Sequence, residues 1–411
     1  MTNNIFVKCD VCGCILDLKW QVGYLPKSEF MVSCGKCKST IKGTLYTNNK
    51  ELKLNYDIVN AKEVDYKSKL ECDFIIPISG ELITEKMREG VKQYQPTPFI
   101  NLIMLIGPEN FSIYTRRYLS GMDKIEKQKN IYDRFNGLYF NKKYDYLKKE
   151  LKQNLNINMK RWSLKGILEQ KYKADINFLT SFTNITKYTK NKEKIFKNIK
   201  KLKGTNKLEY EKLLRYFSND IDNFEKRLNQ ILDVLLNNYN YFIPVLLLEY
   251  IDKDQIKDIC NKYALTTVHF EDVRSLYLRI YENIMEVSTL VIALDNIIYR
   301  GDYTKIDDTI IVGKNNIEQY RKMSKGNKVK YTITDEIFNS CIPKFDKDIR
   351  NAIGHEDIEY DNFKQKLTYK EGESYLIEYV YNVWRCYEPC LLLYEIILDI
   401  KINILKLENK L

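Results

Sequence analysis

One of the chain's two histidines, His355, follows Arg350 and Asn351 in the stretch Arg-Asn-Ala-Ile-Gly-His. An imidazole, with a pKa of about 6.5, can take up or release a proton near physiological pH. A guanidinium stays charged and presents a planar fork of donors that matches phosphate. Together these groups could support attack of a ribose 2′-hydroxyl on its own phosphate, which needs a base, an acid and a cation for the charge on the phosphorane.

A helix would bring these groups together. Asn351 and His355 are four residues apart and lie on one helix face, which the long Arg350 side chain can reach. Gly354 lowers helix propensity by about 1 kcal/mol but allows another backbone to come close. Because one histidine cannot easily perform both proton transfers, we expect a symmetric dimer that supplies a second one.

A second group of chemically active residues lies near the N-terminus. Two Cys-x2-Cys pairs about twenty residues apart have the spacing of a four-cysteine zinc site built from two knuckles. The predicted ligands are Cys9, Cys12, Cys34 and Cys37. Four sulfur ligands leave no open position for a reacting water, so the predicted role of the zinc is structural. Gly13 and Gly35 fit the tight turns, and Cys14 is an alternative ligand to Cys12.

Two long amphipathic helices are predicted to position the Arg-Asn-His stretch. Apolar residues recur at steps of three and four between Val273 and Ile298, and again between Ile377 and Leu398. Thr266 or Thr267 could cap the first helix, and Pro389 should kink or break the second. These helices are expected to pack against each other and against a shorter helix around residues 344–355.

The "RNAIGH" stretch between two long helices resembles the Arg-x4-6-His motif of the HEPN superfamily. The resemblance implies a dimeric, metal-independent endoribonuclease with the motif helices facing across the interface. Arg350 would contact phosphate, Asn351 would orient, and His355 would act as acid or base. It also implies products with a 2′,3′-cyclic phosphate and a 5′-hydroxyl, and a role as an abortive-infection or toxin protein in anti-phage defence.

The expected fold is mainly α, divided into four consecutive regions. Residues 1–45 form a zinc-ribbon-like module and residues 46–110 a β-containing region. Residues 111–255 form a helical middle region that restrains the enzyme or senses a phage-derived trigger, and residues 256–411 form the HEPN-like bundle. The apolar run Phe99–Ile106, between prolines, is expected to be a buried segment at a domain junction.

An insert, residues 301–338, separates the first long helix from the motif. Its basic residues could grip an RNA backbone, or they could simply keep a solvated loop in solution. These residues are Lys314, Arg321, Lys322, Lys325, Lys328 and Lys330. The lysine-rich run at residues 190–207 likewise suits either a nucleic acid or a solvated helix face. His269, beside the start of the first long helix, is expected to have a structural or capping role.

Composition limits the alternatives. The chain has 411 residues and 66 Lys and Arg against 55 Asp and Glu, a net charge of +11 that suits a polyanionic partner. We expect no membrane span, no secretory signal and a cytoplasmic location. The alternative function is a non-catalytic nucleic-acid-binding or regulatory protein whose zinc module binds and whose bundle only dimerises. A further alternative keeps the bundle catalytic but directs it at a nucleotide cofactor.

Overall fold

The structure is a computed structural model that describes residues 2–48, 53–65, 72–90, 98–155, 163–306, 316–328, 331 and 333–408. The fold is mainly α with a few small sheets. The chain forms two compact units, each assembled from three segments. Unit 1 contains Met1–Leu119, Asn238–Tyr277 and Asp348–Trp384; unit 2 contains Ser120–Asn237, Leu278–Lys347 and Arg385–Leu411. The segments interleave, so these units do not correspond to the four consecutive regions expected from the sequence.

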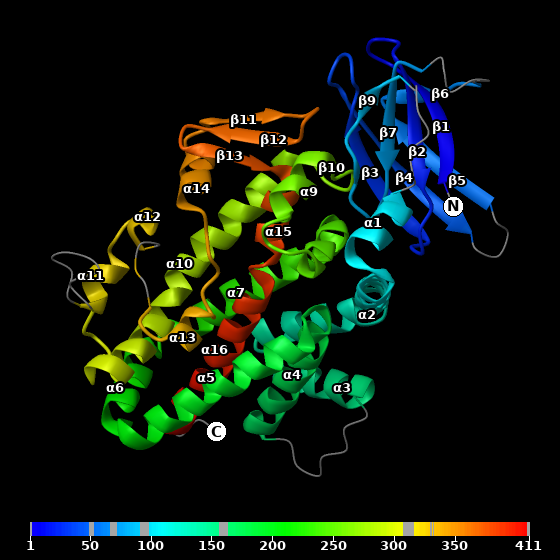
Figure 1. Ribbon diagram of the computed structural model, residues 1–411. Helices are drawn as coiled ribbons and strands as arrows, with labels where there is room; N and C mark the ends of the chain where they lie inside the picture. Colours follow the sequence, from blue (N-terminus) through cyan, green and yellow to red (C-terminus); the bar gives the residue numbers. More distant parts are fainter. Residues whose placement is uncertain are drawn as a thin grey trace. The chain divides into compact units, whose positions relative to one another are not determined.

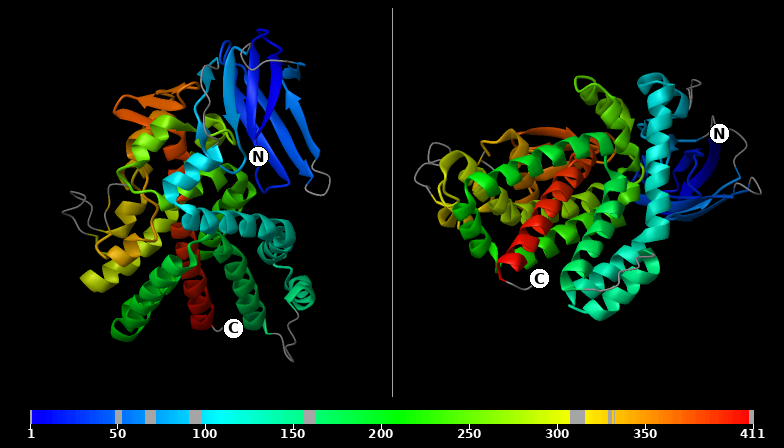
Figure 2. Two further views of the ribbon diagram at one scale, coloured as in Figure 1. Left: turned by 45° about the vertical axis from the view of Figure 1, so that its right-hand side comes forward. Right: turned by 90° about the horizontal axis from the view of Figure 1, so that it is seen from below.

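Unit 1 begins with two sheets that share one hydrophobic core (Figures 1 and 2). The first sheet has the order β6-β1-β2-β7-β9 and the second the order β3-β4-β5. Their bounds are β1 Thr2–Cys9, β2 Ile15–Gln21, β3 Lys27–Ser33, β4 Thr40–Asn48, β5 Lys53–Val59, β6 Ala61–Glu63, β7 Phe74–Ile78 and β9 Arg88–Glu89. The boundary expected at residue 45 therefore falls inside β4, which pairs with β3 and β5.

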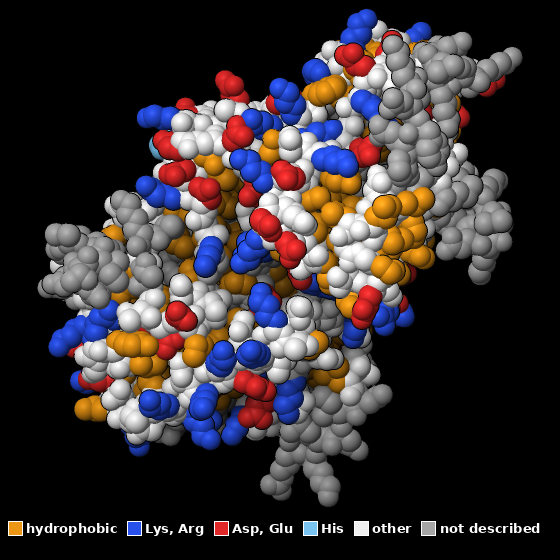
Figure 3. Space-filling model, in the orientation of Figure 1, with side chains coloured by type: hydrophobic (Ala, Val, Ile, Leu, Met, Phe, Trp, Pro, Cys, Tyr) orange, Lys and Arg blue, Asp and Glu red, His pale blue; other side chains and the backbone are white. Residues whose placement is uncertain are grey.

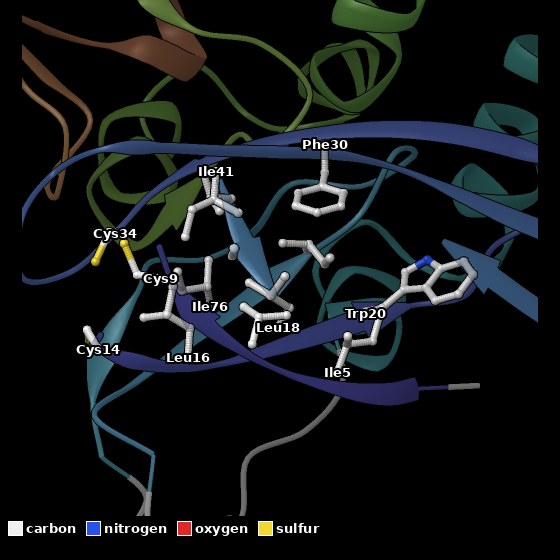
Figure 4. Packing of buried hydrophobic residues seen from close by; sticks show 14 of the residues in the cluster. Ile5, Cys9, Cys14, Leu16, Leu18, Trp20, Phe30, Cys34, Ile41 and Ile76 are labelled. Carbon is white, nitrogen blue, oxygen red and sulfur yellow. The ribbon is translucent and has the colours of Figure 1, made fainter. Parts of the chain in front are cut away.

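The alternation of side chains along the strands creates this core. Ile5 and Val7 on β1 are buried while Lys8 is exposed, because successive side chains of a strand point to opposite faces. Figure 4 shows Leu18 and Trp20 of β2 within the same cluster as Phe30 of β3. The sulfur atoms of Cys9 and Cys34 lie at one end of this core (Figure 4).

The rest of unit 1 is mostly helical. It contains α1 Pro98–Ile106, the start of α2 Pro108–Phe140, α8 Tyr239–Phe242, η3 Ile243–Tyr250, α9 Ile256–Lys262, the start of α10 Phe270–Arg300, nearly all of α14 Lys347–Gly354, and α15 Leu376–Trp384. Short strands complete it: β8 Thr84–Glu85 pairs with β10 Tyr263–Ala264, and β11 Ile358–Asp361, β12 Lys366–Tyr369 and β13 Gly372–Tyr375 form an antiparallel sheet. Aromatic contacts join the start of α10 to α15, including Tyr277 on Tyr379 with ring centroids 5.3 Å apart.

Unit 2 is a helical assembly. It contains most of α2, then α3 Tyr144–Leu155, α4 Leu164–Leu179, η2 Thr180–Phe182, α5 Ile185–Thr205, α6 Lys207–Phe217, α7 Ile221–Asn237, the rest of α10, α11 Ile317–Arg321, α12 Lys325–Lys328, α13 Glu336–Asn339 and α16 Tyr387–Leu407. The helical character predicted for residues 111–255 is thus confirmed for the described residues as far as Tyr250. The most extensive contact of α16 is with α7, and the two lie side by side in Figures 1 and 2. The sequence predicts that the two long C-terminal helices pack against each other, and the α15 part of the second does contact α10 through Tyr379 and Tyr277.

The break near Pro389 is confirmed: α15 ends at Trp384 and α16 begins at Tyr387, which places the proline in the first helical turn, where a missing N–H is tolerated. The predicted caps are wrong, because α10 starts at Phe270 and Thr266 instead exchanges hydrogen bonds with the backbone of Ser79. The burial expected for Phe99–Ile106 is also wrong in part.

That apolar run forms α1, a helix whose Met104 and Ile100 side chains are 79% and 46% exposed. Leu102 and Ile106 are buried, so only one side of the helix is covered within unit 1. Within the described parts of the chain, no single helix has both the length and the apolar character needed to cross a membrane; α7 with residues 239–250 meets those criteria only as a bent pair.

A buried polar network lies inside unit 2. Lys171 and Asp175, one helical turn apart on α4, form an ion pair at 2.5 Å with both side chains 0% exposed. The Tyr394 hydroxyl of α16 donates to Asp175 at 2.9 Å, and the Lys171 ammonium lies 4.3 Å from the centre of the Tyr139 ring. Burial raises the pKa of Asp175, and the attraction of Lys171 opposes that rise. The pair is therefore stable only while both partners are present.

We predict that Asp175→Asn lowers the free energy of unfolding by about 3 kcal/mol, because it leaves the Lys171 ammonium buried without a carboxylate. Urea unfolding followed by circular dichroism measures this loss. The matched control is Asp123→Asn, which removes the carboxylate of a surface pair with Lys127 whose side chains are 53% and 67% exposed. The control should leave the unfolding midpoint almost unchanged. Equal effects of the two variants would show that the buried ion pair stabilises the fold no more than the surface pair does.

Candidate functional site

The four predicted cysteine ligands come from two equivalent loops. Cys9 is the last residue of β1 and Cys12 lies in the connection from β1 to β2, whereas Cys34 and Cys37 lie in the connection from β3 to β4. The first loop belongs to one sheet and the second to the other. The cysteine cluster therefore lies where the ends of two separate sheets meet.

The two loops repeat the same backbone hydrogen bonds. The Cys9 N–H donates to the Cys14 carbonyl at 2.9 Å, and the Cys34 N–H donates to the Ser39 carbonyl at 2.8 Å. A tighter bond closes each turn, from Gly13 to Cys9 at 2.9 Å and from Lys38 to Cys34 at 3.0 Å. Both loops are thus built as the knuckles that the Cys-x2-Cys spacing predicts.

Only one of the two predicted glycine roles is correct. Gly13 has a φ of 72°, in the left-handed region that glycine adopts easily, and the equivalent position of the second knuckle is Lys38, with a φ of 63°. Gly35 serves another purpose: a Cβ there would lie 2.5 Å from the Phe74 ring. Close packing on β7, and not turn geometry, requires that glycine.

The sulfur atoms fit a single metal ion. All four Sγ atoms lie within 4.8 Å of one another. The Cys9–Cys37 and Cys12–Cys34 distances are 3.7 and 3.6 Å, close to the sulfur–sulfur edge of about 3.8 Å in a tetrahedron with metal–sulfur bonds of about 2.3 Å. Four thiolates in tetrahedral array are a donor set that zinc prefers.

Neighbouring donors favour the ionised form of one ligand. The Ser39 hydroxyl lies 3.0 Å from the Cys37 sulfur, and with the Ser39 backbone N–H it lowers the pKa of Cys37 to about 6. Burial instead raises the pKa of Cys34 to about 12. Because a metal binds thiolates, occupation of the cluster would release the remaining thiol protons. Ser39 is a contributor that the cysteine spacing alone did not indicate.

The choice between Cys12 and Cys14 is made by strand direction. Cys14 directly precedes β2, and its side chain is 3% exposed and belongs to the hydrophobic core of the two sheets. Burial first, and then Asp73, raises the pKa of Cys14. Within the described residues, the cluster contains Cys12 and not Cys14.

The Arg-Asn-His stretch lies at the end of α14, within unit 1. The helix buries Ile349, Ala352 and Ile353. Its other side carries Arg350 and Asn351, both half-buried, and leads to the exposed His355 directly after the last helical residue. All three polar residues therefore lie on the side of the helix that does not face its core, as the predicted spacing requires.

The end of α14 is held by a defined cap. Glu356 has a φ of 60°, the Asp357 N–H donates to the Ala352 carbonyl at 2.8 Å, and the Glu356 N–H donates to the Ile353 carbonyl at 3.3 Å. This is the Schellman pattern, in which His355 is the last residue before the left-handed one. The backbone on both sides of His355 is therefore fixed.

Arg274 of α10 strengthens this cap. Its Nη2 atom donates to the Ile353 carbonyl at 3.3 Å and lies 3.8 Å from the Glu356 carboxylate. A second carboxylate, Glu271, holds the guanidinium from its own helix at 3.3 Å. Sequence reasoning did not select Arg274, and no spacing rule connects it with a helix some 80 residues later; only the tertiary contact identifies it.

Within the motif, Arg350 and Asn351 touch. The Arg350 Nη1 atom donates to the Asn351 side-chain oxygen at 3.3 Å. The same nitrogen lies 3.8 Å from where a Cβ on Gly354 would sit, which is an ordinary contact distance. In the described part of the chain, the His355 side chain has no hydrogen bond or ion pair. The guanidinium thus covers the last turn of the helix, and the imidazole extends beyond it into solvent.

Part of the basic insert lies outside the described residues, and that part includes the candidates Lys314 and Lys330. Three of the remaining candidates already face carboxylates of unit 2: Arg321 lies 3.0 Å from Asp220, Lys328 lies 3.3 Å from Glu286, and Lys325 pairs with Glu282. Lys322 is exposed. Paired cations have less charge to offer a phosphate, and Lys328, which is 2% exposed, does not fit a solvated loop either.

The lysine-rich run at residues 190–207 and His269 both lie on or beside helices that pack through apolar or aromatic side chains. Residues 190–207 lie mostly on α5, which buries Tyr188, Ile195, Ile199 and Leu202 and leaves most of its lysines outside. His269 precedes α10, is partly buried, and lies edge-on to Tyr360 with ring centroids 6.3 Å apart. Burial lowers the pKa of His269, which keeps its imidazole neutral over a wider pH range.

Comparison with family models, curated proteins and solved structures finds no match for this chain. Any function must therefore be argued from its own residues.

We predict that the purified protein holds one zinc ion per chain and that Cys12→Ser loses most of it, because a site with three sulfurs binds less tightly. Metal content by mass spectrometry of the desalted protein measures this. Cys14→Ser is the matched control, since it alters a neighbouring thiol of the same loop outside the cluster. Retention of zinc by Cys12→Ser together with loss from Cys14→Ser would assign the ligand to Cys14 instead.

Proposed function

We propose that this protein is a metal-independent endoribonuclease that acts as a homodimer. The supporting observation is that Arg350, Asn351 and His355 share the side of α14 that faces away from its core, with the imidazole exposed. The four clustered cysteines, in this proposal, hold a structural zinc that takes no part in the reaction. A site with four sulfur ligands has no position left for a reacting water.

The roles follow from the chemistry of the three side chains. His355 would remove the proton of a ribose 2′-hydroxyl, or supply a proton to the departing 5′-oxygen. Arg350 would bind the phosphate and offset the charge that develops on the phosphorane. Asn351, which accepts a hydrogen bond from Arg350, would hold the guanidinium in place. The oxygen that attacks belongs to the RNA, so neither water nor a metal ion is needed for this step.

Gly354 supports the dimer. It is exposed, its backbone is helical, and a Cβ there would meet only the end of the flexible Arg350 side chain at 3.8 Å. Nothing within the described chain therefore requires a glycine, although glycine weakens a helix by about 1 kcal/mol relative to alanine. A second α14 crossing at this point would require it. The partner's imidazole would then serve the proton transfer that a single His355 cannot.

We further propose a HEPN-type effector of bacterial anti-phage defence, working in the cytoplasm. Such an enzyme must be restrained until infection, and unit 2 provides a large helical body for that task. Its long connected helices α2 and α10 also enter unit 1. A phage-derived trigger that acts on unit 2 is the regulatory step that this proposal expects.

The central prediction is that the protein cuts RNA in buffer containing EDTA and that His355→Ala reduces the rate at least a hundredfold, because the proton-transfer group is lost. The 5′ fragments should end in a 2′,3′-cyclic phosphate and the 3′ fragments should begin with a 5′-hydroxyl. Gel assays with end-labelled RNA and mass spectrometry of the ends provide both measurements.

The chain supplies its own control for this experiment. His269 is the other of its two histidines, so His269→Gln removes an imidazole outside α14 and should leave cleavage largely intact. Cleavage that is equally fast in His355→Ala would exclude the proposed mechanism. Salt-dependent RNA binding without any strand cleavage would instead support the non-catalytic alternative.

The variant Gly354→Ala distinguishes the contribution of Gly354 to folding stability from its contribution to dimerisation. The substitution should raise the free energy of unfolding by up to about 1 kcal/mol, because alanine is the better helix former and the structure leaves room for its methyl group. In contrast, it should weaken dimerisation and RNA cleavage by crowding the second helix. Thermal unfolding, analytical ultracentrifugation and the cleavage assay give the three values. A variant that is more stable, equally dimeric and equally active would show that Gly354 lies outside any interface.

A further inference from the structure

A second candidate site lies elsewhere in unit 1, in a cavity of about 290 Å³. Its walls come from four places in the chain: the β2–β3 connection, the segment after β7, the start of α1 and the first turns of α2. Drug-sized pockets usually enclose about 300–1,000 Å³, so this cavity suits one long side chain or a similarly small group.

Aromatic rings form much of the wall. Phe99 of α1 and Phe111 of α2 meet edge to face with ring centroids 5.0 Å apart. Tyr118 of α2 lies to one side of these two rings. Tyr24 of the β2–β3 connection, whose side chain is 53% exposed, lies at the rim of the cavity. The faces of such rings attract cations and stack on planar groups.

A buried carboxylate accompanies these rings. Glu81 lines the cavity and is 5% exposed. One of its oxygens accepts the Leu25 N–H at 2.5 Å, and the other accepts the Tyr118 hydroxyl. A carboxylate has about four acceptor positions, so two remain after these bonds. No lysine or arginine forms an ion pair with Glu81 in the described part of the chain.

The backbone is adapted to hold the carboxylate there. A Cβ on Gly23 would lie 2.3 Å from a Glu81 carboxylate oxygen, so only glycine fits at that position of the β2–β3 connection. Ser79 helps as well, since its hydroxyl accepts the N–H groups of Glu81 and Leu82 at 3.2 and 3.1 Å. An ionised group taken from water without a cation raises the free energy of the empty site, and a bound cation would offset that cost.

The surface beside the cavity is apolar. Figure 3 shows hydrophobic side chains gathered over α1. The exposed apolar residues of this region are Tyr24, Ile100, Met104 and Ile113. A free small molecule bound in the cavity would leave this surface uncovered, whereas a peptide whose neighbouring residues are apolar would cover it.

We propose that this cavity receives an arginine side chain of a partner protein, with apolar residues of the same segment resting on α1. A guanidinium matches the site in three respects: it is a planar cation, it offers two parallel N–H donors to the open positions of one carboxylate, and it stacks on aromatic rings. Arginine buried among aromatic residues is also a frequent energetic centre of protein interfaces. This site is separate from α14, and the proposal does not depend on the endoribonuclease.

The test uses the full, zinc-loaded chain and the peptide acetyl-Leu-Leu-Arg-Leu-Leu-amide, with binding measured by isothermal titration calorimetry. Replacing arginine by citrulline, which keeps the shape but not the charge, should weaken binding at least tenfold. Glu81→Gln should do the same, because the amide keeps an oxygen for the Leu25 N–H but loses the negative charge. Glu29→Gln is the matched control: it neutralises a half-exposed carboxylate on β3 and should not change binding.

Tyr24→Ala is a second test variant, which remains informative if Glu81→Gln fails to fold. It removes an exposed ring at the rim and should weaken the peptide several-fold while the melting temperature stays unchanged. Equal binding of the arginine and citrulline peptides, or no effect of either substitution, would overturn the proposal. Binding of agmatine without binding of the arginine peptide would overturn the assignment to a protein partner, and identical affinity for a lysine peptide would overturn the bidentate arrangement.

Discussion

The linkage of two sheets through four sulfur atoms is the constraint on which unit 1 depends. The β1–β2 and β3–β4 loops each contribute a Cys-x2-Cys pair, and their sheets share one small core. A metal ion bound to all four sulfurs would fix the loops to each other and keep that core closed. Small β modules gain much of their folding free energy from such an ion, since they bury little apolar surface. The other features of unit 1 are attached to these sheets: the Met31 N–H donates to the Thr266 carbonyl at 2.8 Å, just before α10 begins.

From that attachment, a chain of contacts leads to the Arg-Asn-His face. The first turns of α10 carry Arg274, which caps the end of α14 through the Ile353 carbonyl. Three buried apolar residues of α14 fix which side of the helix remains outside. The positions of Arg350, Asn351 and His355 are thus determined by groups that take no part in the proposed chemistry. A cap of this kind fixes the backbone that carries the reacting groups before any ligand binds.

The two candidate sites of unit 1 are suited to ligands of opposite charge. On α14, a half-buried guanidinium and an exposed imidazole are suited to a phosphate. In the cavity beside α1, a carboxylate is buried among aromatic rings and suited to a cation. Their opposite preferences mean that one ligand would not serve both. Unit 2, in contrast, contains buried polar groups that bind one another: Lys171 and Tyr394 both donate to one oxygen of Asp175.

The sequence by itself determined the features that depend on short-range spacing. Cys-x2-Cys pairs form knuckles because the turn geometry is local, the apolar repeats gave the long helices, and Pro389 marked the break between α15 and α16 through its missing N–H. Asn351 and His355 share a helix side for the same reason.

Only the tertiary structure decided the features that depend on distant partners. It selected Cys12 over Cys14 because the β2 direction turns Cys14 into the core, and it placed α16 along α7. It left one side of α1 uncovered, and it brought Glu81, Gly23 and Tyr118 together from three separate segments. Periodicity specifies which side of an element is apolar, but the partner that covers that side is set by the packing of the whole unit.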